Sequence, residues 1–248
     1  MQCAYCQQDR KLIDAHIIPR PFHPEADGAE AVILAGPDNL AYPRRAPVGV
    51  YDQHILCAEC DAKLGELDQH AVECLLRGAC HSFVHQGQAR GKTYDTADAD
   101  TILRFIVAVA WRASIARHEM FERVTSEKYE SEMLQVLKSG DLLNFDAVIA
   151  EFDENTVGFL NPHQSRFDGV RFMVIYAGRF VFYLKLDKRQ MPFSFRTHSL
   201  RISGVVRTVV RDYSRSKEFN VMRMIFEQPH LARMRKKWAL GPKRKKEL

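Results

Sequence analysis

Two Cys-x-x-Cys pairs are the residues whose type and spacing point most directly to chemistry: Cys3 with Cys6, and Cys57 with Cys60. Two such pairs supply the four soft ligands of a tetrahedral structural zinc site. The long stretch between the pairs raises the cost of closure only modestly, because loop entropy grows logarithmically with length. The spacing predicts one structural Zn²⁺ site, and the alternative is four unrelated buried thiols.

Catalysis would need other side chains, because zinc held by four cysteines has no open position for a substrate. His16 is the first candidate, since an imidazole can serve as a general base near neutral pH. Hydrolysis of a phosphodiester would also need a divalent ion, preferably Mg²⁺, held by carboxylates and phosphate. Asp14 and Asp61 are the nearest acids in the sequence, and on a regular strand Asp14 would share a side with His16.

Short elements must position these groups. Residues 12–19 form an apolar stretch that contains several β-branched side chains and ends in proline, which predicts a short strand around His16. Residues 21–50 lack periodicity and are expected to form a long loop or insertion. From Asp61 onward, apolar residues three and four apart predict a helix, with Asp61 as a possible N-cap.

The rest of the chain predicts a larger body with an α+β fold. A Gly-containing connector is expected at 86–92, helices over 100–121 and 128–138, a β-hairpin over 170–186, and a strand or helix over 203–211. Together these patterns predict an N-terminal zinc-stabilised module (1–92), an α+β body of unknown role (93–230) and a basic tail (231–248).

Composition describes an ordinary globular protein, with 46% hydrophobic and 27% charged residues in 248. We find no signal peptide and no apolar run that could span a membrane, which favours a cytoplasmic protein with reduced thiols. The formal net charge is +5, and the lysine-rich tail carries the positive balance. Such a tail attracts phosphates, or is simply a solvated end.

The order of these residues resembles the HNH (His-Asn-His) endonuclease superfamily over residues 1–75. The resemblance lies in a Cys-x-x-Cys pair, a strand ending in Ala15-His16-Ile17-Ile18-Pro19, and the run Tyr51-Asp52-Gln53-His54-Ile55-Leu56 before the second pair and Asp61. It implies a ββα-metal, treble-clef-like core and metal-dependent hydrolysis of DNA. It assigns the general base to His16, the middle position to Asp52 and the metal-ligand position to Asp61.

Three residues depart from that pattern. Ala15 stands where an ion-binding residue is common, Asp52 replaces an asparagine, and Gly65 replaces a second helix histidine. Metal binding would then shift to Asp14 with Asp61, or be lost. The alternative function is an inactive zinc module that binds nucleic acid or a protein partner.

Other residues carry two interpretations each. Asp68 and His70 belong either to the solvated face of the helix or to the site, and His54 is expected to be a structural neighbour of the zinc. Cys74 and Cys80 are expected to be core or free thiols rather than a minor site with His70 or His81.

The aromatic residues of the hairpin and Trp111 are expected in the core. The arginines of 196–223 form either a phosphate-binding face or a solvated edge.

Overall fold

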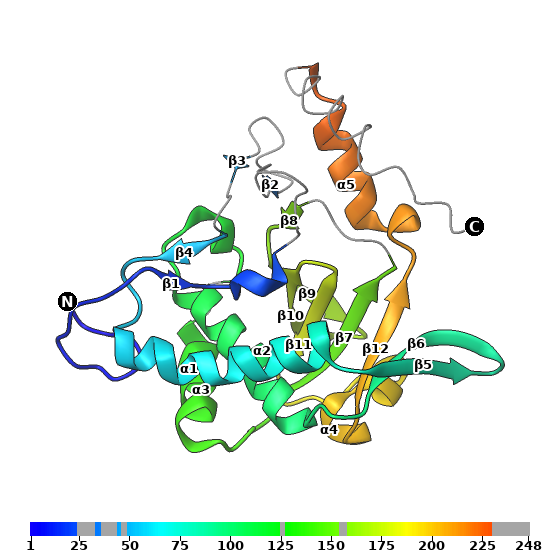
Figure 1. Ribbon diagram of the computed structural model, residues 1–248, viewed down its shortest axis with the longest axis horizontal. Helices are drawn as coiled ribbons and strands as arrows, with labels where there is room; N and C mark the ends of the chain where they lie inside the picture. The colour runs from blue at the N-terminus through cyan, green and yellow to red at the C-terminus, as the bar shows by residue number, and fades with distance from the viewer. Residues whose placement is uncertain (24–32, 36–43, 46–48, 125–126, 154–157, 230–248) are drawn as a thin grey trace.

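The computed structural model describes residues 1–23, 33–35, 44–45, 49–124, 127–153 and 158–229 (Figure 1). The expected tail at 231–248 and most of the expected loop at 21–50 lie outside these ranges. The fold is mixed α+β, as the sequence predicts. Within the described residues, no helix is both long and apolar enough to cross a membrane.

A seven-stranded sheet forms the centre of the described part of the molecule, in the order β5-β6-β12-β7-β11-β10-β9. All neighbours are antiparallel except β12 and β7, which run parallel. Its strands are β5 (Cys80–His85), β6 (Gln88–Tyr94), β7 (Asp146–Phe152), β9 (His163–Phe167), β10 (Val170–Ala177), β11 (Phe180–Lys185) and β12 (Val206–Arg211).

Two smaller sheets complete the strands. One pairs β1 (Ala15–His16) with β4 (Tyr51–Asp52), and the other orders β3 (Arg44–Arg45), β2 (Ile33–Ala35) and β8 (Gly158–Leu160). The strand predicted around His16 is therefore present but is only two residues long.

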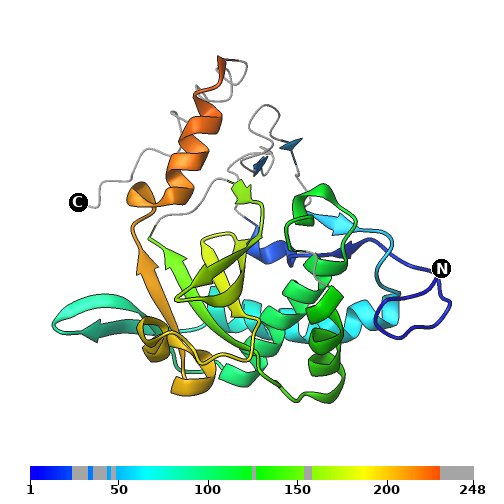
Figure 2. The same ribbon diagram turned by 180° about the vertical axis from the view of Figure 1, so that it is seen from behind.

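The helices are α1 (Ala58–Ala71), which continues as a π-helical turn (Val72–Arg77), α2 (Ala99–Ile115), α3 (Glu127–Ser139), α4 (Leu200–Ser203) and α5 (Lys217–Phe226). Short 3₁₀ turns lie at Arg20–Phe22, Glu119–Phe121, Phe193–His198 and Tyr213–Arg215. In Figure 2, α1 to α3 lie toward the side of the molecule that holds the N-terminus, the β5–β6 hairpin extends at the opposite side, and α5 projects upward.

Helix α2 is the central core element, which explains its apolar run over 105–111. Most of its residues are buried, and it contacts α1, α3 and strands β7 and β11. The Asp98 side chain caps it by accepting a hydrogen bond from the Thr101 N–H at 2.7 Å. Trp111 is 2% exposed, so it is a core residue as predicted.

The expected connector at 86–92 is wrong, because these residues form the turn and second strand of the β5–β6 hairpin. Gln86 and Gly87 both have positive φ (51° and 74°), as a tight two-residue hairpin turn requires. The proposed boundary after residue 92 falls inside β6, and β6 pairs with β12 of the body. The predicted hairpin at 170–186 is confirmed as β10 and β11.

One hydrophobic core joins the cysteine-bearing segment to the sheet. Tyr5 meets Trp111 edge-on at 6.0 Å between ring centroids, and its hydroxyl donates to the Leu137 carbonyl of α3 at 3.1 Å. Phe22 stacks on Phe105 of α2 at 5.3 Å. Aromatic contacts of this kind fix the position of the N-terminal segment against α2 and α3.

Candidate metal centre

The first cysteine pair lies in a tight turn closed by the backbone. Gln2 and Asp9 form an isolated antiparallel bridge, and the Cys3 N–H donates to the Gln8 carbonyl at 2.9 Å. Gln7 has a φ of 62°, the left-handed conformation that lets the chain reverse. The turn brings Cys3 and Cys6 to the same side, facing the second pair.

The second pair lies where α1 begins. Leu12 bridges to Cys57, which is the N-cap of α1, and Cys60 lies in its first turn. Unpaired N–H groups and the positive end of the helix dipole favour thiolates at this position. The Cys57 N–H donates to the Cys3 sulfur at 3.4 Å, which joins the two pairs directly.

The four Sγ atoms all lie within 4.8 Å of one another. Tetrahedral zinc with Zn–S bonds of 2.3 Å would separate its sulfurs by about 3.8 Å, so the cluster is close to the required size. Three of the cysteines are buried, and Cys6 is half-buried. The predicted grouping of Cys3, Cys6, Cys57 and Cys60 is confirmed, and these thiols lie close enough to bind a metal ion such as zinc.

The electrostatics of the cluster also suit a cation. Although burial opposes it, backbone N–H groups of Cys6, Cys57 and Tyr5 lower the pKa of the Cys3 thiol to about 7. Burial, followed by the neighbouring thiols, raises the pKa of Cys60. Four thiolates this close together repel one another, and a bound cation removes that repulsion.

His16 and Asp52 come from the short β1–β4 ladder, which lies between the cysteine pairs in the sequence. Asp52 pairs with Ala15 and is buried, whereas His16 pairs with Tyr51 and is half-buried. Because neighbouring residues of a strand face opposite sides, Asp52 points inward and His16 points toward the surface. The His16 and Tyr51 ring centroids are 6.3 Å apart.

The Asp52 carboxylate is a structural clamp. One oxygen accepts the His54 N–H at 2.8 Å, and the other accepts the Arg117 N–H at 2.6 Å. The clamp therefore ties β4 to the chain that follows α2. The His54 side chain is exposed, so its backbone N–H makes this contact rather than its imidazole.

Asp61 lies on α1 within electrostatic reach of His16. Burial raises the pKa of Asp61, Arg112 opposes that rise, Asp68 adds to it, and His16 opposes it. The N-cap expectation is wrong: Cys57 occupies that position, and Asp61 is the fourth residue of the helix. Asp14, the other acid considered for a divalent ion, is exposed and precedes β1.

Asp68 lies two turns beyond Asp61 on α1 and joins the helix to α2. Both of its carboxylate oxygens accept from the Arg112 guanidinium, at 2.7 and 2.8 Å. Arg112 is 1% exposed. Sequence reasoning missed Arg112, although an arginine directly after the apolar run 105–111 of α2 was a signal for a buried ion pair.

The remaining thiols do not extend the cluster. Cys74 is buried and lies 3.5 Å from the Nε2 of His70, whereas Cys80 is exposed. His81 contacts Asp95 at 2.9 Å. In the part of the chain that the structure describes, the N-terminal cysteines are the one group of three or more His, Cys, Asp or Glu close enough to hold an ion.

Comparisons with protein-family models, with curated proteins and with solved structures give no match for this chain.

Proposed function

We propose that this protein is a metal-dependent endonuclease of the HNH type that hydrolyses phosphodiester bonds in DNA. The observation that carries it is the cysteine cluster, which ties the turn before the ladder of His16 to the start of the helix that bears Asp61. The cluster thereby links the element of a potential base to the element of a potential metal ligand, 45 positions apart in the sequence.

The order of elements supports a treble-clef-like core. The chain passes from a cysteine turn through a short antiparallel ladder to a second cysteine pair at the start of a helix. Zinc bound by both turns would fix the ladder relative to α1. His16 projects from the ladder and Asp61 from the helix, so the zinc ion sets the geometry of the pair without touching the substrate.

Each residue then has a distinct task in hydrolysis. His16, half-buried at the surface, accepts a proton from the attacking water. Asp61 would offer a carboxylate oxygen to a divalent ion, and Asp14 and the substrate phosphate would be the further ligands. Mg²⁺ or a similar ion, when bound, would stabilise the negative charge on the phosphate. Asp52 positions the loop through its two backbone contacts.

Asp52 fits this positioning role despite replacing asparagine. Both of its contacts are with N–H donors, so an acceptor is needed at each oxygen, and neither contact requires the amide donor of asparagine. Ala15 is fully buried in the core and cannot ligate an ion. The divalent ion must therefore rely more on the substrate phosphate than in sites with an acid at that position.

A second candidate is a non-catalytic zinc module that binds nucleic acid or a protein partner. The Arg112 guanidinium favours it, because this buried cation already lies near Asp61 and engages both oxygens of Asp68. A fixed positive charge at that place weakens the binding of a divalent cation.

The experiment is a supercoiled-plasmid nicking assay with added Mg²⁺, Mn²⁺ or Ni²⁺. Wild type and His16→Ala are compared after both are shown to retain zinc. We expect nicking by wild type alone. If both proteins leave every form of DNA and RNA intact with all three ions, the nuclease proposal fails. Nucleic-acid binding that survives His16→Ala unchanged would then support the non-catalytic module.

A further inference from the structure

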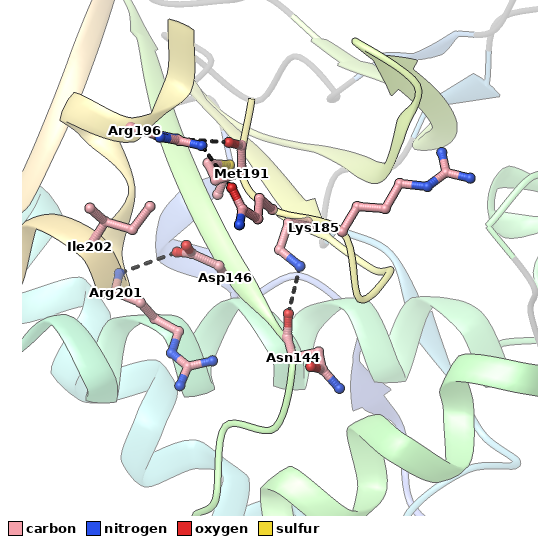
Figure 3. Close-up of a pocket in the computed structure, with 9 residues that line it drawn as sticks. Asn144, Asp146, Lys185, Met191, Arg196, Arg201 and Ile202 are labelled. Carbon is pink, nitrogen blue, oxygen red and sulfur yellow. Dashed lines mark hydrogen bonds between the residues drawn. The ribbon is translucent and has the colours of Figure 1, made fainter. Parts of the chain in front are cut away.

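A basic pocket lies in the body, formed by residues that the cysteine cluster does not use (Figure 3). Its volume is about 370 Å³. It opens between the start of β7, the end of β11, the turn after β11 and helix α4. Its lining residues are Asn144, Asp146, Lys185, Arg189, Gln190, Met191, Arg196, Arg201 and Ile202.

Four of the lining residues are cations, and their side chains donate hydrogen bonds to neutral oxygens. Lys185 donates to the Asn144 carbonyl at 2.9 Å and to the Asp187 carbonyl. Arg196 donates to the Met191 carbonyl and the Gln190 amide, and Arg201 to the Leu143 and Phe145 carbonyls. Arg189 donates to the Gly169 carbonyl.

Asp146 is the acid of the pocket lining, and its oxygens are already engaged. It accepts from the Ser199 hydroxyl at 2.6 Å and from the N–H groups of Ala147 and Arg201. Within the described part of the chain, no ion pair at 4.0 Å or less joins a carboxylate to Lys185, Arg189, Arg196 or Arg201. The positive charge of the pocket is therefore poorly compensated.

Lys185 shows how burial in this positively charged pocket affects a cation. The residue is 6% exposed, and burial lowers the pKa of its ammonium group, an effect that Asp187 and Asp146 oppose. Figure 3 shows Lys185 reaching toward Asn144 at the base of the pocket. An anion within hydrogen-bonding distance stabilises a buried ammonium group that otherwise donates to carbonyl oxygens.

A second pocket, near α5, shows the opposite arrangement. It is also lined by arginines, but Arg211 is held by both oxygens of Glu218 at 2.9 and 3.0 Å. Arg215 is paired with Asp212 at 3.2 Å. Of the arginines of 196–223, Arg211, Arg215 and Arg223 are thus paired with carboxylates, Arg196 and Arg201 line the basic pocket, and Arg207 lies over the Phe83 ring.

An exposed aromatic ring lies beside the basic pocket. Phe193 is 84% exposed, and the guanidinium carbon of Arg196 lies 6.0 Å from its ring centroid. Ile202, which lines the pocket, is 58% exposed. Aromatic rings beside cations are the features on which proteins stack unpaired bases while they hold the neighbouring phosphate.

We propose that the basic pocket binds a backbone phosphate of a single-stranded nucleic-acid segment, whose adjacent base stacks on Phe193. The choice of nucleic acid over another phosphate carrier rests on the proposed function. The phosphate chemistry itself rests on the four cations. The site would hold a strand during cleavage or, in a non-catalytic module, provide binding alone.

The test is the salt dependence of binding, measured by fluorescence anisotropy on the full-length protein without added divalent ion. The probe is a labelled single strand of about 16 nucleotides, long enough for one binding site. We compare wild type, Arg196→Gln, Arg189→Gln with Arg196→Gln, and Phe193→Ala. Arg223→Gln, which removes an exposed cation of α5 elsewhere, is the charge-matched control. Thermal melting confirms that each variant folds.

Each lost phosphate contact should reduce the slope of log K against log salt by about 0.7. Arg196→Gln should therefore flatten the slope, and the double variant should flatten it further. Phe193→Ala should weaken binding about tenfold at unchanged slope, because stacking on a neutral ring releases no counterions. Arg223→Gln should behave as wild type.

Slopes and affinities for the pocket variants that equal those of Arg223→Gln would overturn the proposal. Equal binding of duplex and single strand, with no effect of Phe193→Ala, would overturn the assignment of a single strand. Inorganic phosphate or a mononucleotide that competes as tightly as the oligonucleotide would reassign the pocket to a small phosphate compound. Because this binding assay contains no divalent ion, it is independent of the plasmid assay. Binding as expected here, with no nicking in the plasmid assay with Mg²⁺, Mn²⁺ or Ni²⁺, would reject the nuclease and keep this inference.

Discussion

The cysteine cluster and the basic pocket each gather four like groups, but their stability without a counter-ion differs. The cysteine sulfurs lie within 4.8 Å of one another and converge on a single point. The cations of the basic pocket are hydrogen-bonded to carbonyl and amide oxygens, so they remain in place without an anion. The comparison suggests that the first cluster depends on its ion to fold, whereas the second uses an ion only for binding.

The largest expected effect is the loss of the metal at the cysteine cluster. Cys60→Ser should abolish zinc binding and lower Tm by at least about 10 °C, because structural zinc contributes much of the folding energy of small modules. Zinc per chain by mass spectrometry, with calorimetry, provides the measurement. Cys80→Ser, at an exposed thiol outside the cluster, is the matched control and should change neither quantity. An unaltered Tm in Cys60→Ser would mean that the cysteine cluster, like the basic pocket, does not depend on a bound ion to fold.

The next effect concerns the ion pair that joins α1 to α2. Asp68→Asn should cost about 3–5 kcal/mol of unfolding free energy, because it leaves the Arg112 charge buried and unpaired. Urea denaturation of Asp68→Asn and of Glu66→Gln, an exposed acid on the same helix, measures the difference. A cost below about 1 kcal/mol would indicate that the zinc ion alone positions α1, since surface pairs contribute little.

Acid should destabilise the N-terminal segment through His23. Burial, which outweighs the hydrogen bond with the Ile18 carbonyl, lowers the pKa of His23 to about 4. Between about pH 6.5 and pH 4 the unfolded chain takes up a proton that the folded protein resists, so stability falls as the pH falls. The loss is about 3 kcal/mol at most.

Calorimetry across this pH range, on wild type and on His23→Leu, tests the prediction. The variant should lose less stability than wild type on acidification, and His54→Leu, at an exposed histidine, should follow wild type. Parallel pH profiles for wild type and His23→Leu would contradict it. Subtracting one profile from the other also removes any acid effect on zinc, which is common to both proteins.

The smallest effect should come from the basic pocket. Ile202→Glu places a carboxylate beside the four cations and should stabilise the protein by about 0.5 kcal/mol, the value typical of exposed ion pairs. The same change should abolish oligonucleotide binding. Ile202→Gln is the control, because glutamine has nearly the same shape as glutamate but no charge. It should leave the free energy of unfolding unchanged. Destabilisation by Ile202→Glu alone would mean that the pocket is not electropositive.

The cysteine site was predictable because its signal is local. Each Cys-x-x-Cys pair is complete within four residues, and two pairs suffice to indicate a metal site. The helices at 99–115 and 127–139 and the hairpin at 170–185 were also predictable, since periodicity and β-branched runs are properties of single segments.

The features that escaped prediction are long-range. The Asp52 oxygens are occupied by backbone groups at 54 and 117, and Asp68 is paired with Arg112 of another helix. The β6 strand lacked an apolar pattern and took its conformation from pairing with β5 and β12. Cations of the basic pocket come from β11, the turn after it, the 3₁₀ turn Phe193–His198 and α4, so no sequence motif brings them together.

The most direct measurement of the central claim is the single-turnover rate of DNA cleavage with saturating Mg²⁺ or Mn²⁺, for His16→Ala against His54→Ala. Both variants remove one imidazole from the same cysteine-bearing segment and leave the four cysteines intact, so both should bind zinc and fold. The account predicts that His16→Ala reduces the rate by at least about 100-fold, the usual contribution of a general base, while His54→Ala cleaves as wild type. Equal rates for the two variants, or no cleavage by the zinc-loaded wild type, would contradict it.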